Sequence, residues 1–305
     1  MRILLTGSSG WLGQGLAPRL CSLGHEVIGL DPIPSPQTQV TGSVADRALV
    51  RAVIGDHRIQ AVIHSGALHQ PDMARRTRED FMAVNIGGTL NLLEEAAALG
   101  VERFVFTSTT SLMITAEIRA GARGGARRAA WLTEQAAPEP RNIYGATKLA
   151  AESLCRVMYR DTGLPVVVLR TARFFPEADD MAHAIEQSDA NTKANELLYR
   201  RLTAEDAVEA HVAALGKAPE LGFDIFIISA TPPFSPDDAE ALITDAPGVV
   251  ARYFPDYPAI YRQLGWTMFQ SIDRVYDPGH AARRLGFICK TGFGDMLARL
   301  KAELG

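Results

Sequence analysis

The chain has few cysteines, little excess charge and no long apolar run, and each shortage excludes a class of protein. Its three cysteines, at positions 21, 155 and 289, are scattered and odd in number, which fits reduced thiols rather than a disulfide framework or a zinc site. The formal net charge of −4 leaves no basic field for a nucleic-acid backbone. Arg2 leads into a short apolar run unlike a signal peptide, and no stretch reaches membrane-spanning length. We therefore expect a cytoplasmic protein without metal, membrane or nucleic-acid partners.

What the chain does have is globular composition, with 47% hydrophobic and 22% charged residues among 305, enough for a large core. Short apolar runs alternate with longer helical patterns through the first half. This alternation predicts βαβ units, and hence a doubly wound α/β fold of the Rossmann type with a parallel sheet. Strands are expected at residues 2–6, 26–31, 61–63, 104–108 and 165–171, and helices at residues 11–23, 45–56, 81–99 and 144–160.

The alternation fades after about Phe175, where proline-rich stretches such as residues 231–236 separate shorter elements. The pattern predicts one domain over residues 1–175 that carries the sheet, and a smaller, irregular lobe over residues 176–305, from which some segments return to the sheet. Residues 117–130 are rich in Ala, Gly and Arg and lack a clean helical period. We expect them to form a long connection.

Glycines mark the turn between the first predicted strand and the first predicted helix, in Gly7-Ser8-Ser9-Gly10-Trp11-Leu12-Gly13. Glycine lets a backbone turn tightly and approach a pyrophosphate, and the helix N-terminus that follows supplies N–H donors. Asp31 ends the second predicted strand, near the offset of about 20 residues expected for a ribose-binding acid. A carboxylate accepts hydrogen bonds from a ribose 2′-OH but repels a 2′-phosphate. The pattern predicts binding of NAD rather than NADP; a glycine-rich turn followed by a surface Asp is the alternative.

Tyr144 and Lys148 lie four residues apart in a helical pattern, so both side chains project from one face. An ammonium beside a phenol stabilises the phenolate, which would make Tyr144 easier to ionise and suited to acid–base catalysis near neutral pH. A buried Tyr and a solvated Lys give the same spacing by chance. The catalytic interpretation is favoured because a predicted strand ends at residues 106–110, and parallel-sheet enzymes place active groups at such strand ends.

Together these motifs resemble the extended short-chain dehydrogenase/reductase family, the group that contains NAD-dependent sugar epimerases, dehydratases and reductases. The resemblance covers nearly the whole chain and is most specific over residues 1–171. It is carried by residues 6–13, 62–67 (Val-Ile-His-Ser-Gly-Ala), 85–89 (Asn-Ile-Gly-Gly-Thr), 107–109 (Thr-Ser-Thr) and 144–148.

The resemblance implies a role for each matched residue. Thr109 takes the place of the substrate-binding Ser or Thr, Tyr144 is the acid or base, and Lys148 binds the nicotinamide ribose and tunes Tyr144. The residues placed along NAD, with Ser43 and Val44 at the adenine, are Gly7, Gly10, Trp11, Leu12, Gly13, Asp31, Ser43, Val44, Gly66, Ala67, Asn85, Tyr144, Lys148 and Thr171.

Three departures from the family pattern concern the substrate. Residues 110–111 are Thr-Ser where sugar-nucleotide dehydratases carry Asp-Glu, which disfavours 4,6-dehydration, and the Arg-Pro-Gly-Asp signature for a diphosphate is missing. Arg173 stands where many relatives have Asn. It could hold a substrate carboxylate or phosphate, or it could form an ion pair with Glu177 or Asp179.

Other polar residues are candidates for contact with the substrate. Lys193 and Arg201 lie where relatives place cations that touch substrate phosphates, and a solvated helix flank is the alternative. The arginines at 119, 123, 127 and 128 suit a lid over an anionic ligand or an ordinary solvated surface. His69 would reach the substrate or the nicotinamide, unless it is simply a satisfied polar group. The candidates for the substrate site are His69, Thr109, Thr110, Arg173, Lys193 and Arg201.

The leading hypothesis is an NAD-dependent oxidoreductase that acts on a secondary alcohol or ketone of a sugar, sugar acid or related polyol, with an anionic small molecule as a candidate substrate. A sugar-nucleotide epimerase with tightly bound NAD would use the same residues. A dinucleotide-sensing protein without catalysis is the alternative from another class, and the intact Thr109, Tyr144 and Lys148 argue against it. Relatives commonly pair through two helices of each subunit, so we expect a homodimer formed by residues 81–99 and 144–160.

Overall fold

The computed structural model describes residues 1–121, 126–174 and 187–304. The chain divides into two compact units that interleave along the sequence, each with its own hydrophobic core. The first unit comprises Met1–Leu112, Pro140–Thr171 and Ala207–Phe226, and the second comprises Met113–Glu139, Ala172–Asp206 and Ile227–Gly305.

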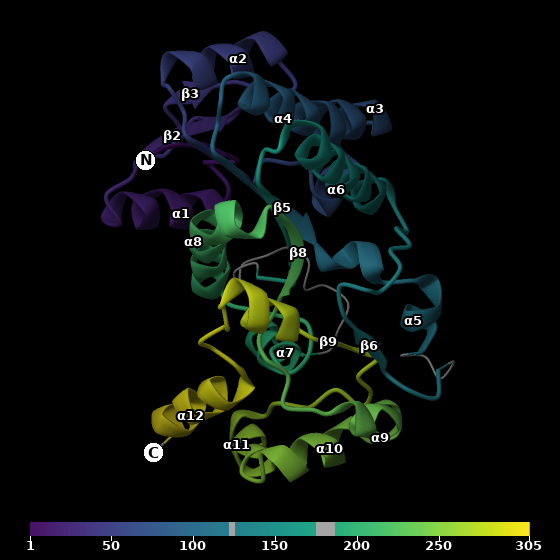
Figure 1. Ribbon diagram of the computed structural model, residues 1–305. Helices are drawn as coiled ribbons and strands as arrows, with labels where there is room; N and C mark the ends of the chain where they lie inside the picture. The colour runs from purple at the N-terminus through teal and green to yellow at the C-terminus, as the bar shows by residue number, and fades with distance from the viewer. Residues whose placement is uncertain (122–125, 175–186, 305) are drawn as a thin grey trace. The chain divides into compact units, whose positions relative to one another are not determined.

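The first unit is built on a seven-stranded sheet with the strand order β3-β2-β1-β4-β5-β7-β8 (Figure 1). The neighbouring strands from β3 to β7 run parallel. The chain proceeds from β1 through β2 to β3 and then continues on the other side of β1 with β4, so a topological switch point lies between β1 and β4. The strands are β1 (Arg2–Thr6), β2 (Glu26–Asp31), β3 (Val40–Thr41), β4 (Ala61–His64), β5 (Arg103–Thr109), β7 (Val166–Thr171) and β8 (Phe223–Ile228).

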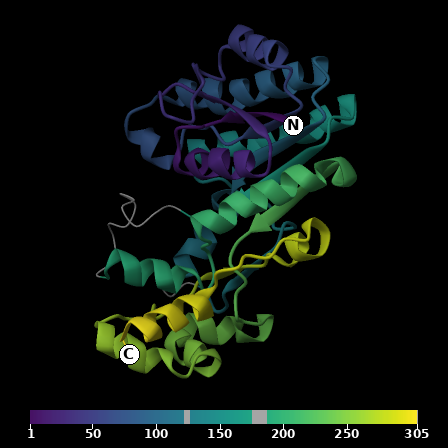
Figure 2. The same cartoon turned by 90° about the vertical axis from the view of Figure 1, so that its left-hand side faces the viewer.

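Helices cover both faces of this sheet (Figures 1 and 2). On one face α1 and α8 lie together, joined by an ion pair between Arg19 Nε and Glu209 Oε1 at 2.6 Å. On the other face α4 packs between α2 and α6. The helices of this unit are α1 (Trp11–Ser22), α2 (Arg47–Asp56), α3 (Arg78–Phe81), α4 (Gly88–Ala98), α6 (Ile143–Thr162) and α8 (Ala204–Leu221).

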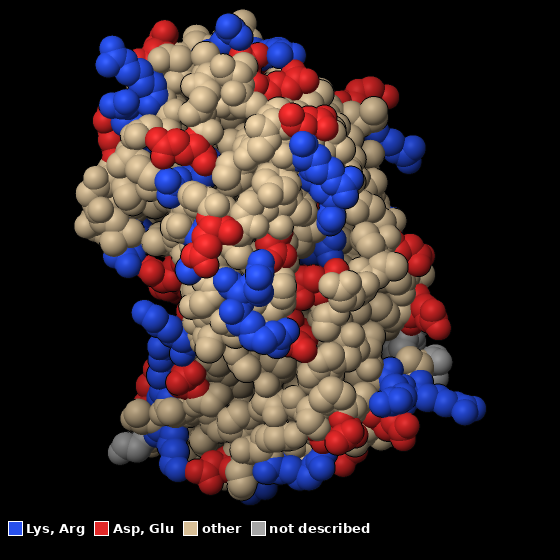
Figure 3. All heavy atoms as spheres, in the orientation of Figure 1, with Lys and Arg blue, Asp and Glu red and all other residues tan. Residues whose placement is uncertain are grey.

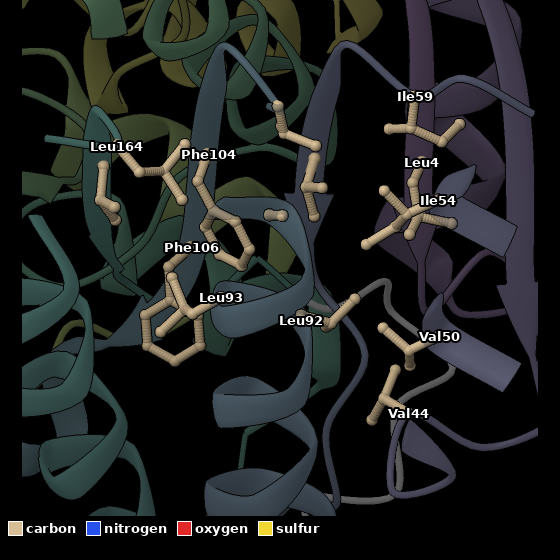
Figure 4. Close-up of a cluster of buried hydrophobic side chains, with 14 of the residues drawn as sticks. Leu4, Val44, Val50, Ile54, Ile59, Leu92, Leu93, Phe104, Phe106 and Leu164 are labelled. Carbon is tan, nitrogen blue, oxygen red and sulfur yellow. The ribbon is translucent and has the colours of Figure 1, made fainter. Parts of the chain in front are cut away.

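The main core lies between the sheet and α2, α4 and α6. Figure 4 shows Phe104 and Phe106 of β5 next to Leu93 of α4, and all three side chains are buried. Burial of each such side chain contributes about 1.5–3 kcal/mol. Successive strand residues point to opposite faces, so this burial fixes the orientation of β5. Ser108 therefore shares the α6 face with the phenylalanines, and Thr107 lies on the α8 face.

The second unit contains a two-stranded parallel sheet, β6 (Ala130–Leu132) with β9 (Arg274–Tyr276). Aromatic side chains contribute much of its core, and the rings of Tyr257 and Tyr261 meet edge to face with centroids 5.3 Å apart. Its helices are α5 (Ala116–Gly121), α7 (Asp189–Glu196), α9 (Ala239–Thr244), α10 (Ala246–Tyr253), α11 (Tyr257–Leu264) and α12 (Phe293–Leu304).

The predicted fold class is confirmed, and most predicted strands and helices of the first half end within two residues of their observed limits. The helix predicted over residues 81–99 is interrupted, because a π-helical segment (Met82–Gly87) precedes α4. The connection expected over residues 117–130 is wrong at its start, where α5 is helical. The two units interleave, because residues 113–139 belong with the second unit and residues 207–226 with the first.

On the face seen in Figure 3, acidic and basic side chains are interspersed, in keeping with the small net charge. Within the described part of the chain, no helix is long and apolar enough to cross a membrane.

Candidate active site

The glycine-rich turn lies at the switch point, between β1 and α1. Gly7 adopts φ +73°, which side chains disfavour, and a Cβ there would approach the backbone nitrogen of Gly66, after β4, to 2.6 Å. A Cβ on Gly13 would overlap the carbonyl oxygen of Gly7, so α1 packs directly on the turn. A Cβ on Gly10 would meet only that same oxygen, at 3.4 Å. The protein itself fills the space at Gly7 and Gly13 and leaves room at Gly10, an arrangement that fits a pyrophosphate at the helix N-terminus.

Asp31 ends β2 beside this turn. Its buried carboxylate accepts hydrogen bonds from the backbone N–H of Ser9 (3.3 Å) and of Ile33 (2.8 Å). Both bonds hold the carboxylate at the edge of the glycine-rich turn. The position of this carboxylate therefore fits the adenosine ribose of NAD, because a fixed carboxylate accepts hydrogen bonds from ribose hydroxyls and repels a 2′-phosphate.

A buried histidine ties the ends of β1 and β4 together. His64 Nε2 lies 3.0 Å from the Thr89 hydroxyl, which itself donates to the Asn85 carbonyl, so Nε2 is the donor and Nδ1 accepts from the Thr6 hydroxyl at 2.7 Å. Burial lowers the pKa of His64 to about 3. A neutral ring therefore bridges the strands and holds Thr6, whose hydroxyl also accepts from the Gly66 N–H at 3.1 Å.

Asn85, in the π-helical segment, supports the loop after β4. Its side chain accepts from the Leu68 N–H (2.8 Å), donates to the Leu68 carbonyl (3.0 Å) and donates to the Thr147 hydroxyl of α6 (3.0 Å). π-Helical turns often occur at functional sites. Here the segment lets one amide hold Leu68, next to Ala67 and Gly66, against the helix that carries Tyr144.

Helix α6 brings Tyr144 and Lys148 to the end of β5. The helix starts at Ile143 because the Asn142 side chain caps it, accepting from the Gly145 N–H at 2.9 Å. Tyr144 and Lys148 are both buried. They stand one turn apart on the face that packs on the sheet.

The catalytic candidates contact β5 at three consecutive residues. The hydroxyl of Thr109 lies near enough to Tyr144 to lower the pKa of its phenol, and it donates to the Ser111 hydroxyl at 3.0 Å. Lys148 Nζ donates to the Thr107 carbonyl at 2.8 Å and lies 4.7 Å from the centroid of the Phe106 ring. The structure thus brings together the three residues Thr109, Tyr144 and Lys148 predicted from sequence.

The charges at this site differ from the expectation. Burial raises the pKa of Tyr144 to about 12, against the opposing effect of its hydrogen bond with Thr109. Burial also lowers the pKa of Lys148 to about 8, while Cys155 and Glu152 favour its charged form. The prediction that Lys148 makes the phenol easier to ionise is wrong for this arrangement, because the ammonium is bonded to a carbonyl and desolvation of Tyr144 dominates. Tyr144 therefore holds its proton firmly here.

His69 lies beside Tyr144, with ring centroids 5.5 Å apart. The backbone N–H of His69 donates to the Asp72 carboxylate at 2.7 Å, at the start of a short 3-10 helix (Gln70–Ala74). Burial and the neighbouring charge of Lys148 lower the pKa of His69 to about 4, so the ring is neutral near pH 7. Its contact with a substrate stays a prediction.

Two predicted hydroxyl groups at the strand ends bond to the protein. The Thr110 hydroxyl donates to the Thr171 carbonyl at 3.3 Å, and the Thr171 hydroxyl donates to the Ser108 carbonyl at 3.1 Å. Both bonds join β7 to β5 or to its end, so these hydroxyls stabilise the catalytic strand. At the opposite edge, Ser43 and Val44 follow β3, and the Val44 carbonyl accepts from the Asn91 side chain at 3.0 Å.

In the second unit, one buried carboxylate gathers three arginines. Glu196, the last residue of α7, lies 2.8 Å from Arg200, 2.8 Å from Arg201 and 3.6 Å from Arg173. Arg173 thus forms an ion pair with Glu196, a partner that sequence analysis did not consider. Its predicted partners, Glu177 and Asp179, lie outside the described residues.

The remaining cations predicted for the substrate lie in the same unit. Lys193 is buried in α7 with its ammonium 3.2 Å from Asp189, so it is not a solvated flank. Arg128 is exposed and 3.9 Å from Glu240. The side chains of Arg119 and Arg123 lie outside the described part of the chain. Contact of any of these cations with a substrate stays a prediction.

Sequence analysis missed two buried groups that contact the catalytic strand. Glu152 accepts from the Ser108 hydroxyl at 2.5 Å and pairs with Arg170 of β7 at 2.8 Å. His211 of α8 lies 2.8 Å from the Thr107 hydroxyl. Two of these residues carried a signal in the sequence: Glu152 continues the four-residue spacing of Tyr144 and Lys148, and Arg170 is a charged residue in an apolar strand.

Among the described residues, no three His, Cys, Asp or Glu side chains gather in a way that could hold a metal ion. The polar groups that do converge are the backbone and carboxylate groups of the switch point and the Thr109, Tyr144 and Lys148 set. Such groups suit a dinucleotide and a proton transfer.

Comparison with known proteins agrees with this chemistry. The chain is 29% identical over 178 residues to UDP-glucose 4-epimerase of Azospirillum brasilense, a match that covers 55% of this chain and 48% of the relative. It is 33% identical over 130 residues to 3β-hydroxysteroid dehydrogenase/Δ5→4-isomerase of Mycobacterium tuberculosis, covering 39% and 35%. The matches thus span less than half of these relatives. The crystal structure of UDP-glucose 4-epimerase with UDP-glucose from Thermotoga maritima has the same fold, with a TM-score of 0.69, 21% identity and 100% coverage of both chains.

Residues 3–228 match the model of the NAD dependent epimerase/dehydratase family. This range holds the seven-stranded sheet except for Arg2, the first residue of β1, and it holds every predicted catalytic and cofactor-binding residue. The match confirms the predicted resemblance and the family's cofactor, NAD. The chain belongs to the NAD-dependent epimerase/dehydratase family.

Proposed function

We propose that this protein is an NAD-dependent oxidoreductase that acts on a secondary alcohol, or on its ketone, in a sugar, sugar acid or related polyol. The observation that carries the proposal is that the hydroxyls of Thr109 and Tyr144 lie near each other at the end of β5, with Lys148 one turn further along α6. A phenol and a second hydroxyl side by side can hold one substrate oxygen and exchange its proton.

The cofactor would be held by the groups at the switch point. Gly10 leaves room for the pyrophosphate, Asp31 accepts from the adenosine ribose, and Gly66 lies against Gly7 where the backbone must pass the cofactor closely. When bound, NAD supplies the hydride acceptor and, in its oxidised form, a positive charge that favours phenolate at Tyr144.

The chain's own residues supply the proton chemistry. Thr109 donates to or accepts from the substrate oxygen and orients it, and Tyr144 removes the hydroxyl proton in oxidation or returns it in reduction. The high pKa of Tyr144 makes the acid role the easier one without a neighbouring positive charge. Burial of Tyr144 and Lys148 keeps bulk water from the phenol.

A sugar-nucleotide 4-epimerase is the second candidate, favoured by the similarity to the epimerase of A. brasilense. An epimerase would use the same oxidation, retain the ketone and return the hydride to its other face. The two candidates differ in their use of free NAD, because an epimerase consumes none. The Thr-Ser at residues 110–111 disfavours a third possibility, 4,6-dehydration.

A substrate panel combined with Tyr144→Phe tests the proposal. UDP-glucose, UDP-glucuronate, free hexuronates and neutral hexoses are each incubated with NAD or NADH while NADH absorbance is followed, and products are separated to detect epimers. We expect turnover of at least one sugar, and a loss of about 10²-fold or more in Tyr144→Phe with NAD binding retained. Near-normal turnover by that variant would refute the role of Tyr144, and binding of NAD without turnover of any panel sugar would favour the sensing alternative.

We also propose a homodimer formed through α4 and α6. Val157 of α6 is 47% exposed and Met82, just before α4, is 55% exposed, so apolar surface is available on the helical face of the first unit. Light scattering at micromolar concentration should give twice the mass of 33.0 kDa. A monomeric mass would contradict this proposal.

A further inference from the structure

Helix α6 presents a third polar residue to the sheet, beyond the two that sequence analysis assigned. Tyr144, Lys148 and Glu152 recur at intervals of four residues, so they lie along one face of the helix. Tyr144 contacts Thr109, Lys148 contacts the carbonyl of Thr107, and Glu152 contacts the residue between them. All of these contacts fall within the first unit. Three successive turns of α6 therefore contact three consecutive residues of β5.

Glu152 joins α6 to two strands at once. One oxygen accepts from the Ser108 hydroxyl at 2.5 Å and from Arg170 Nε at 3.0 Å, and the other accepts from Arg170 Nη2 at 2.8 Å. Ser108 and Arg170 are direct neighbours in the pairing of β5 with β7. The side chains of Glu152 and Arg170 are only 3% and 5% exposed. One carboxylate thus fixes the helix, the catalytic strand and its neighbour at a single level.

We propose that Glu152, held by Arg170, is a positioning residue for the reaction: through Ser108 it sets the level of α6 against β5 at which Tyr144 meets Thr109 and Lys148 meets the Thr107 carbonyl. Its hydrogen bonds go to Ser108 and Arg170, not to Thr109 or Tyr144. This inference rests on the proposed function, and it extends the catalytic motif by one helical turn to a buried residue with a partner on another strand.

A purely stabilising role explains the arrangement less well. A buried ion pair is weak evidence for stability, because the cost of desolvating both charges offsets much of their attraction, and an apolar pair of similar volume is often as stable. Directional hydrogen bonds, in contrast, specify one geometry. Fixing a reacting group to within about 1 Å is worth about 10²-fold in rate. The arrangement therefore points to alignment rather than to added stability.

The carboxylate also acts on Lys148. Glu152 and Cys155 on α6 face the ammonium and favour its charged form, against the dominant effect of burial, and the titratable groups from other elements are His64 of β4 and His69 of the following loop. Both histidines are neutral near pH 7. Removal of the Glu152 carboxylate should therefore lower the pKa of Lys148 below its value of about 8.

Two variants separate alignment from packing. Glu152→Gln leaves Arg170 buried without its carboxylate and should be destabilised. Glu152→Leu/Arg170→Met removes both charges at similar volume and should fold with stability near that of the wild type. Glu95→Gln is the matched control, because Glu95 is a buried carboxylate of α4 that pairs with Arg47 and Arg51 and contacts no catalytic residue.

The readouts are thermal unfolding, NAD affinity, kcat and KM on an active panel sugar, and the pKa of Lys148. The last is followed by NMR of 13C-labelled lysine, with Lys148→Met to assign the signal among five lysines. We expect the double variant to unfold near the wild-type temperature and to bind NAD normally, while kcat falls about 10²-fold, KM changes little and the Lys148 pKa falls. The control should lose stability without a shift of the Lys148 pKa.

A double variant with wild-type kcat and wild-type Lys148 pKa would overturn the proposal and show that Glu152 and Arg170 serve only the packing of the core. The same would follow if Glu95→Gln shifted the Lys148 pKa as far as Glu152→Gln does, since the effect would then come from general destabilisation. If the wild type binds NAD but turns over no panel sugar, the proposed function fails, and the NMR titration still decides whether Glu152 sets the state of Lys148.

Discussion

Two buried carboxylates, one in each unit, differ in the charge that surrounds them. Glu152 in the first unit pairs with one arginine, Arg170, accepts from the Ser108 hydroxyl and also favours the charged form of Lys148. Glu196 in the second unit faces the three arginines 173, 200 and 201. Among the described residues, Glu196 is thus shared by more guanidinium groups than Glu152 is.

The difference indicates two uses of buried charge. A proton transfer at Tyr144 is served by charged groups that hydrogen bonds hold in place, so that the phenol responds to the cofactor and the substrate. A carboxylate buried among several guanidinium groups is costly to remove, because its loss leaves buried charge uncompensated. We predict that the cluster around Glu196 contributes to binding of an anionic substrate, although the sequence signature for a diphosphate is missing.

The largest expected effect comes from removing the carboxylate of Glu196. Glu196→Gln removes the carboxylate that the three arginines share, and should cost about 3–5 kcal/mol of the free energy of unfolding in urea titrations. Added phosphate should recover part of that loss, because an anion can take the place of the carboxylate.

Glu152→Gln provides the contrast. It leaves the guanidinium of Arg170 in a site that is nearly closed to solvent, so phosphate should not recover its stability. Equal recovery of both variants by phosphate would show that the anion acts on the protein in general, and would remove the distinction between the two carboxylates.

The features that the sequence predicted depend on local pattern. Strand and helix positions in the first half follow from apolar runs and their period, and the site residues Gly7, Asp31, Tyr144 and Lys148 follow from motifs tied to strand ends. These features depend on local pattern, and residues that are close in sequence determine them.

The missed residues depend on contacts between distant segments. His211 approaches Thr107 only because α8 returns to the first unit, and Glu196 meets Arg173 across a segment of the chain that carries no motif. The pKa of Tyr144 was also misjudged, since spacing on a helix places Lys148 nearby but says nothing of the carbonyl that takes up its ammonium. Burial and pairing of this kind are properties of the assembled fold.

His211 gives a test of the first unit by pH. Its Nδ1 donates to the Ala207 carbonyl at 2.7 Å, so Nε2 accepts from the Thr107 hydroxyl, and burial lowers the pKa of His211 from 6.5 to about 4. The folded state holds the neutral ring, so its contribution to stability is complete above pH 6.5 and is lost as the pH falls from 6.5 towards 4. The slope is about 1.4 kcal/mol per pH unit for one such group.

His211→Gln should remove that part of the slope. Glutamine keeps an acceptor for Thr107 and a donor for the Ala207 carbonyl but gains no proton. Urea titrations between pH 7 and pH 4 should give a shallower fall of stability than in the wild type, and the other groups whose pKa is lowered, such as His64 and His69, contribute to the slope that remains. An unchanged slope would mean that His211 is protonated in the folded protein.

The smallest expected effect concerns recognition by the cluster around Glu196. If these arginines serve the substrate, Arg173→Ala should raise KM for an acidic sugar about tenfold, which corresponds to about 1.4 kcal/mol, and should leave KM for a neutral analogue and NAD affinity nearly unchanged. Arg252→Ala is the matched control, because Arg252 is an exposed arginine of the same unit that pairs with the buried Asp238 at 2.7 Å and is not a candidate for contact with the substrate. Unfolding temperatures of both variants separate lost recognition from lost pairing with Glu196. Equal losses on acidic and neutral sugars in Arg173→Ala would show that Arg173 serves only to pair Glu196, and the two buried carboxylates would then differ in charge without differing in use.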